Sequence, residues 1–379
     1  MRNAKKPTLC KVTVFSTLFA TALLQPCFSS ANQMNGDETI RQPIAMSQKI
    51  TPNRIGVLVY THGVPNDPLR FNPDNDKITA IENDLEKFIR IPSEKILHMP
   101  YTWDFGLMSL DKSGVKYSIL LYTDMFGPDS TVIHNVTRIF AGIENVDTCP
   151  GLLINESNSG SLDSSGHTNY TKTVQKYGPI CSYMGAITIP APKFTDSTII
   201  LAEPARPDHP ILREIFVKQV KSVSQKPKNE IIVFVGHGAK KDFNDEAQKK
   251  ELSNAANYAE RKLGFLGSIG VTAREDWPSL SDVAVPKAVS EIKSLLNNTG
   301  AKNVILVPAT GGHDFNMIAE ALDKEGIPYV SAPKTLPLGE MEFRKWALNT
   351  TRETINFIKR EKPTKSTITP YWNRTYNNQ

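Results

Sequence analysis

Residues 231–239 read "IIVFVGHGA", in which five apolar residues lead into Gly-His-Gly. A run of apolar residues that ends in Gly-His-Gly is typical of a buried strand of a parallel sheet followed by a tight loop. Residues 55–63, "IGVLVYTHG", repeat the phrase with a second His-Gly pair. The repeat indicates a duplicated unit, with His62 or His237 placed directly after the first strand of each copy.

Strand-like and helix-like segments alternate outward from this phrase. In the second half, strands are predicted at 231–238, 267–275, 302–313 and 327–336. Helices are predicted between them, one of them over 286–300, with Pro286 near its start and Gly300 past its end. The alternation predicts an α/β fold of two similar domains, each a mainly parallel sheet with helices on both faces.

Composition shifts along the chain predict the domain boundaries. Residues 224–230, "SQKPKNE", are polar and indicate a linker between the two copies. The predicted segments are a signal peptide (1–31), a polar lead-in (32–50), a first domain with a Ser/Asn/Gly-rich insertion (51–225), a second domain carrying the main site (226–362) and a polar tail (363–379).

The first residues have the layout of a secretory signal peptide. Basic "MRNAKK" precedes the apolar run "VTVFSTLFATALL", and "FSSA" supplies small residues before a predicted cleavage after Ala31. The apolar run is short for a membrane span, and no later stretch is apolar enough to span a bilayer. We therefore expect a secreted or periplasmic protein that does not span a membrane.

Cysteines and glycosylation sequons fit an exported chain. Cys10 and Cys27 leave with the signal peptide, so Cys149 and Cys181 remain, either as one disulfide or as two buried thiols. Asn-x-Ser/Thr sequons occur at Asn135, Asn155, Asn169, Asn297, Asn349 and Asn373. They carry glycans only in a eukaryotic secretory pathway, and the sequence leaves the source compartment open.

Charge and motifs argue against several classes of function. The net charge of +5 is small for 379 residues, and no nucleic-acid-binding motif is present. The chain also lacks a phosphate-binding loop, a dinucleotide fingerprint, a His-Glu-x-x-His motif and a nucleophile elbow. We expect a small-molecule partner, no nucleic acid and no organic cofactor.

Histidines at strand ends are the candidate chemistry. His237 follows the first strand of the second half and His313 follows the third, and ligands bind beyond the carboxyl ends of such strands. Neutral imidazoles suit Co²⁺, Fe²⁺, Ni²⁺ and Zn²⁺. Glu275, or else Asp276, at the end of the second strand is the predicted oxygen ligand. Hydrogen-bonded structural histidines are the alternative interpretation.

Four segments in order, "VGHGAKKDFND", "WPSL", "VILVPATGGHD" and "YVSAP", resemble the class II chelatases, the family of sirohydrochlorin cobaltochelatases and ferrochelatases. "YTHGVP" and "EPARPDHPILREI" extend the resemblance more loosely to the first half. The resemblance implies insertion of a divalent metal, Co²⁺ or Fe²⁺ and possibly Ni²⁺, as substrate into a tetrapyrrole, in tetrapyrrole or cobalamin biosynthesis. It maps His237 and His313 onto the family's active-site histidines, which act as metal ligand and proton acceptor, with Glu275 as the carboxylate.

This sequence departs from the family pattern at two places. Family members usually carry Glu directly before the Pro-Ser pair, where this chain has Trp277. In the first half, "SILLYTDMFGPD" holds no histidine, and Asp124 or Asp129 is the nearest substitute. We therefore expect one principal site, in the second half, with His62 as a further metal-facing residue between the domains.

The remaining histidines are assigned to structure. We expect His209 to be structural, and His98, His134 and His167 to be surface or packing residues. The alternative function is a non-catalytic periplasmic or extracellular protein that binds metal or haem on the same fold. The sequence is compatible with a homo-oligomer.

Overall fold

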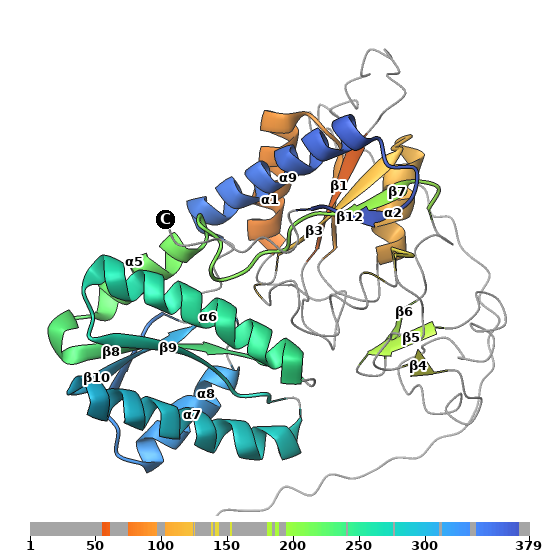
Figure 1. Cartoon of the computed structure of the whole chain (residues 1–379). Helices are drawn as coiled ribbons and strands as arrows, with labels where there is room; N and C mark the ends of the chain where they lie inside the picture. Colours follow the sequence, from red (N-terminus) through yellow and green to blue (C-terminus); the bar gives the residue numbers. More distant parts are fainter. Residues whose placement is uncertain are drawn as a thin grey trace, which may run out of the picture. The chain divides into compact units, whose positions relative to one another are not determined.

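The computed structural model describes residues 55–60, 75–96, 103–123, 125, 138, 141–143, 152–153, 180–183, 186–188, 195–239, 242–275, 277–310, 313–333 and 339–370. These all belong to one compact unit, residues 50–379. Two parallel sheets, each accompanied by helices, make up most of it (Figure 1). The predicted α/β class with two similar sheets is confirmed.

The sheet of the second half has the order β11-β10-β8-β9, and all of its strands are parallel. Its strands are β8 (Glu230–Gly236), β9 (Gly267–Thr272), β10 (Asn303–Pro308) and β11 (Tyr329–Ser331). The strand that begins the half therefore lies between β9 and β10. The prediction that the first and third strands of this half are neighbours is confirmed.

Alternate side chains of β8 face two different cores. The helices around this sheet are α5 (Arg213–Val223), α6 (Asp242–Leu263), α7 (Pro278–Thr299) and α8 (His313–Lys324). Ile232 and Phe234 pack with α5 and α6, whereas Ile231, Val233 and Val235 pack with α7 and α8. Burial on both faces explains why the strand is a continuous apolar run rather than an alternating one.

Helix α7 begins earlier than the sequence predicts. Pro278, not Pro286, occupies the first turn, so Pro286 lies inside the helix. Both prolines suit a first turn, where their missing N–H costs no hydrogen bond. The end is as predicted: Gly300 adopts a φ of 71° and its N–H bonds to the carbonyl of Leu296.

The sheet of the first half has the order β12-β7-β3-β1-β2 and is also parallel. Its elements are β1 (Ile55–Tyr60), α1 (Asn75–Ile89), β2 (Ser93–Ile96), α2 (Trp103–Lys112), β3 (Tyr117–Tyr122), β7 (Thr198–Leu201) and β12 (Thr367–Ile368). Strand β12 comes from the polar tail, where the sequence predicts no strand. Two residues are too few to show a strand period.

Two helices are exchanged between the halves. Helix α5 follows β7 of the first sheet, yet it packs on α6: Tyr258 Oη donates to Glu214 at 2.5 Å. Helix α9 (Met341–Glu361) follows β11 of the second sheet, yet it packs on α1, where Arg344 binds both oxygens of Asp84 at 2.6 Å. We call α5 and α9 the exchanged helices.

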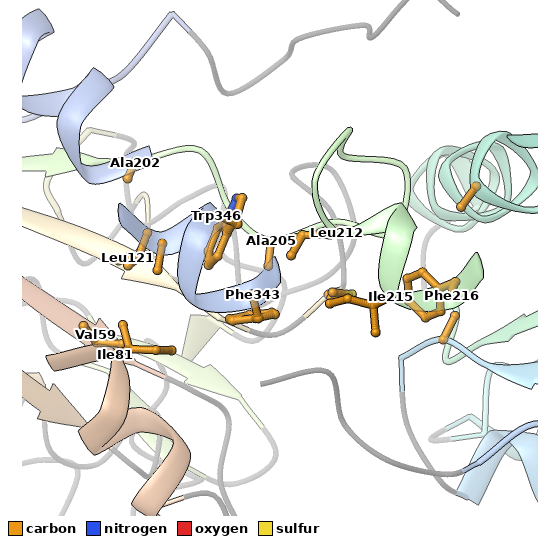
Figure 2. Close-up of a cluster of buried hydrophobic side chains, with 14 of the residues drawn as sticks. Val59, Ile81, Leu121, Ala202, Ala205, Leu212, Ile215, Phe216, Phe343 and Trp346 are labelled. Carbon is orange, nitrogen blue, oxygen red and sulfur yellow. The ribbon is translucent and has the colours of Figure 1, made fainter. Parts of the chain in front are cut away.

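The exchanged helices share one buried apolar cluster. Phe343 and Trp346 of α9 stack with their ring centroids 5.0 Å apart. Figure 2 shows Ala205 and Leu212, from the segment between β7 and α5, beside these rings. Phe216 of α5 belongs to the same cluster. Packing, rather than chain order, therefore decides which sheet each exchanged helix covers.

An ion pair links the exchanged helices and makes a pH prediction possible. Lys218 Nζ of α5 lies 2.6 Å from Glu342 Oε1 of α9, and this hydrogen bond lowers the pKa of Glu342 below its usual 4.5. A carboxylate with a depressed pKa stabilises the fold above its unfolded pKa, and this contribution is lost as pH falls through the folded pKa. Glu342→Gln should therefore flatten the pH dependence of the urea midpoint below about pH 5. Glu291→Gln, on the surface of α7, is the control, and parallel curves for Glu342→Gln and wild type would contradict the prediction.

A small antiparallel sheet comes from the predicted insertion. It consists of β4 (Leu152–Leu153), β5 (Ile180–Tyr183) and β6 (Ala186–Thr188). Cys181 lies in β5, whereas Cys149 lies outside the described residues, so the disulfide stays a prediction. Within the described ranges, no helix combines the length and apolar character that a membrane crossing requires.

Candidate functional site

The carboxyl ends of three adjacent strands bring the candidate residues to one edge of the second sheet. His237 directly follows β8, Glu275 comes shortly after β9, and His313 begins α8 after β10. Because these strands are parallel neighbours, their carboxyl ends lie at the same edge. Figure 1 labels β8, β9 and β10 next to one another in this sheet.

His237 and Glu275 face each other at this edge. Imidazole Nε2 lies 3.7 Å from carboxylate Oε1, and both side chains are about five-sixths buried, with 15% and 16% exposed. Imidazole Nδ1 lies 3.0 Å from the carbonyl oxygen of Gly238. A carbonyl only accepts hydrogen bonds, so this contact requires the proton on Nδ1. In the neutral ring with this tautomer, the lone pair is on Nε2, the nitrogen that lies toward Glu275, and such an arrangement can hold a cation or receive a proton.

A turn in a left-handed conformation aims Glu275 at His237. Arg274 has a φ of 55°, which is uncommon outside glycine. Its backbone N–H donates to the carbonyl of His237 at 2.7 Å, and its Nη1 donates to Asp242 at 2.8 Å. These bonds hold the turn, and they tie the end of β9 to the end of β8.

Buried side-chain oxygens hold the backbone of the histidine loop, which we define as residues 236–239. The N–H of His237 donates to Thr310 Oγ1 at 2.7 Å and that of Gly238 to Gln248 Oε1. The N–H of Ala239 donates to Asp245 Oδ1 at 3.3 Å. Asp245, Gln248 and Thr310 are all buried. The sequence pattern does not predict these acceptors.

Gly238 is required by the geometry of the loop. Its φ is +86°, and a Cβ there would lie 2.7 Å from Arg274 Cγ and 2.7 Å from Asp245 Oδ1. Gly300 has a similar φ of +71° but open space around it. Gly300→Ala should therefore cost only the left-handed strain of about 1–2 kcal/mol.

We expect Gly238→Ala to add about 1–3 kcal/mol of overpacking to that strain. Urea unfolding of the two glycine variants measures the difference. Equal losses of stability in Gly238→Ala and Gly300→Ala would show that the loop accommodates a methyl group.

Trp277 covers one side of the candidate histidine. Its ring centroid lies 5.8 Å from that of His237, edge-on at 85°. Trp277 is also the N-cap residue of α7, where it makes no side-chain capping bond. Ser, Thr, Asp and Asn are the residues that capping favours, so local helix energetics do not explain a tryptophan here.

Other predicted site residues are placed differently. His209 is buried, and its Nδ1 accepts the N–H of Ile211 at 3.1 Å, a structural hydrogen bond. Outside the described residues lie the side chain of His313 and the whole of His62, His98, His134, His167, Asp124, Asp129 and Asp276. Among the described residues, no group of three or more His, Cys, Asp or Glu side chains could hold a metal. The described part of the site therefore supplies a pair, His237 and Glu275.

Comparisons with known proteins find similar structures but no sequence match. No family model matches the chain, and no curated protein matches it. SirB from Bacillus subtilis with Fe³⁺ is 15% identical and has a TM-score of 0.45, over 79% of this chain and 95% of that one. The sirohydrochlorin chelatase SirB from Bacillus subtilis subspecies spizizenii in complex with cobalt is 13% identical, with a TM-score of 0.40, over 81% and 98%. DR2241 from Deinococcus radiodurans, a multi-domain protein with structural similarity to chelatases, is 11% identical, with a TM-score of 0.40, over 79% and 54%.

Likeness at these scores carries no inference about chemistry. The function of this chain is therefore argued from its own residues, above all from the pair at the carboxyl edge of β8 and β9.

Proposed function

We propose that the protein is an exported chelatase that inserts a divalent metal, Co²⁺ or Fe²⁺, into sirohydrochlorin or a related tetrapyrrole. One observation carries the proposal: His237 Nε2 lies 3.7 Å from the Glu275 carboxylate, at the carboxyl edge of a parallel sheet. An imidazole nitrogen and a carboxylate oxygen are ligands that suit these metals. The metal is a substrate here, not a resident cofactor.

Insertion of a divalent metal into a tetrapyrrole requires groups that accept two protons. Each metal ion that enters the macrocycle replaces two pyrrole N–H protons, so two protons must leave for every turnover. In the proposed mechanism, His237 Nε2 accepts one proton and Glu275 passes protons toward solvent, for which its partial exposure of 16% is suited. His313, at the end of the neighbouring strand β10, is the proposed second histidine for metal or proton.

Trp277 and the buried loop serve this chemistry in the proposed mechanism. The indole beside the imidazole limits ring rotation and keeps water from one side of Nε2. It also offers an apolar surface next to the base, which suits a flat macrocycle. Export is proposed from residues 1–31 alone, whose pattern is typical of a signal peptide.

Absorbance spectroscopy tests the proposal directly. Purified protein, Co²⁺ and sirohydrochlorin should give the spectrum of the metallated macrocycle faster than metal and macrocycle alone. Glu275→Gln, which keeps the shape but removes the base, should slow the reaction, whereas Glu291→Gln on the surface of α7 should not. A rate equal to that of metal and macrocycle alone would contradict the proposed chelatase activity. Retained Co²⁺ or haem binding without turnover would instead support the non-catalytic binding protein.

A further inference from the structure

The geometry points to Asp245 as a positioning residue that acts on His237 through a single peptide group. We infer that the Asp245 carboxylate, by binding the N–H of the Gly238–Ala239 peptide, fixes the Nδ1–H tautomer of His237 and keeps the Nε2 lone pair available. The consequence for metal insertion rests on the proposed function, but the tautomer itself does not.

The two ends of one peptide group join the carboxylate to the imidazole. Its carbonyl oxygen, on Gly238, lies 3.0 Å from His237 Nδ1. Its N–H, on Ala239, donates to Asp245 Oδ1 at 3.3 Å. Gly238, which carries this carbonyl, has a positive φ of 86°. A carboxylate, a peptide and an imidazole thus form a chain of hydrogen bonds.

The negative charge of Asp245 polarises the hydrogen-bonded peptide group. A carboxylate that accepts from the N–H polarises the peptide and makes its carbonyl oxygen a stronger acceptor. Asp245 is only 2% exposed, so solvent screens this effect little. Its Oδ1 also accepts from Thr272 Oγ1 at 2.8 Å, and its Oδ2 lies 2.8 Å from Lys249 Nζ. The carboxylate therefore binds three groups, and the Ala239 N–H is the one that leads to His237.

Two acceptors near His237 favour different tautomers of its ring. Gly238 O attracts a proton to Nδ1 from 3.0 Å, whereas Glu275 Oε1 attracts a proton to Nε2 from 3.7 Å. A hydrogen bond at 3.0 Å is well formed, and one at 3.7 Å is not. Weakening the carbonyl by removing the Asp245 charge shifts this balance toward Nε2–H. That tautomer has no lone pair on Nε2, so it neither binds metal nor accepts a proton at that atom.

Ring-nitrogen NMR of the ¹⁵N-labelled full chain reads the tautomer. The chain has seven histidines, so a His237→Gln variant identifies the signal. At about pH 8 an ordinary imidazole is neutral. We expect wild-type His237 to show Nδ1–H and Asp245→Asn to shift toward Nε2–H. Thr272→Val, the matched control, removes the other hydrogen bond to Oδ1 but leaves the peptide contact, so it should keep the wild-type tautomer.

A Co²⁺ titration, which measures metal affinity, is the second test of this hydrogen-bonded arrangement. Loss of an outer partner of a metal-binding histidine typically costs 10- to 100-fold in metal affinity. We expect a loss of about this size in Asp245→Asn and none in Thr272→Val.

Three results would overturn the inference. They are an Nε2–H tautomer in the wild-type protein, a wild-type tautomer in folded Asp245→Asn, and the same shift in both variants. The first is read from the wild-type protein once the His237 signal is assigned, so the inference remains testable even when Asp245→Asn does not fold. Absence of chelatase turnover would overturn the proposed function and leave these readouts unaffected.

Discussion

Replacing His237 with alanine should slow metal insertion by about 10²- to 10⁴-fold, the range that a positioned general base supplies. The side chain provides the nitrogen that lies beside Glu275, and alanine leaves the two pyrrole protons without this acceptor. The rate of absorbance change at saturating Co²⁺ separates loss of chemistry from loss of metal affinity. Imidazole added to the solution should restore part of the rate, because the variant leaves a cavity of that shape.

His209→Asn is the control for this variant. His209 is a buried histidine whose Nδ1 accepts a backbone N–H, and Asn can accept the same bond. The folded control should insert metal at the wild-type rate. A His237→Ala rate within about twofold of wild type would refute the assignment of His237 as base or ligand, since that difference is far below the range of general-base effects.

Replacing Arg206 with leucine should lower the free energy of unfolding by about 3–5 kcal/mol. The guanidinium lies 3.4 Å from Glu203 and 3.5 Å from Asp208, in the segment that leads from β7 to α5. All three side chains are buried, so leucine leaves two carboxylates away from water without their cation. Urea unfolding followed by tryptophan fluorescence measures the loss.

Lys293→Met provides the comparison for the buried ion pair. Lys293 pairs with Glu325 on the surface, and both side chains are close to half exposed. Such a pair contributes about 0–1 kcal/mol, so its loss should barely move the urea midpoint. If Arg206→Leu and Lys293→Met are equally stable, the buried cluster does not hold the segment between the two sheets.

The sequence predicts the two sheets well because their strands are buried on both faces. A short apolar run such as 231–235 is typical of a strand that is buried on both faces. The alternation of such runs with helices indicates parallel pairing. The start of α7 is not predictable in the same way, because Pro278 and Pro286 both suit a first turn. The local sequences of α5 and α9 do not predict that these helices are exchanged either. An amphipathic helix encodes that it covers a sheet, but not which of two similar sheets it covers.

Residue type and strand position are enough to predict His237 and Glu275 as neighbours at one sheet edge. The position of Glu275 beside His237 follows the left-handed turn at Arg274, and the residue type of an arginine does not predict that conformation. Asp245 and Gln248 are hidden for a related reason. Polar residues in a helix normally indicate its solvent face, whereas these two serve as acceptors for backbone N–H groups of the histidine loop.

The exchanged helices also set the order in which the protein can be completed during synthesis. Helix α9 and strand β12 leave the ribosome well after the strands they accompany, yet they cover α1 and extend the sheet that contains β1. We therefore expect the first sheet to stay incomplete, with part of its apolar surface open to chaperones and proteases, until α9 and β12 have been made. A messenger RNA that ends before the codon of Met341 would yield a product without helix α9. The first sheet of that product would be left uncovered, even though the histidine loop would be present.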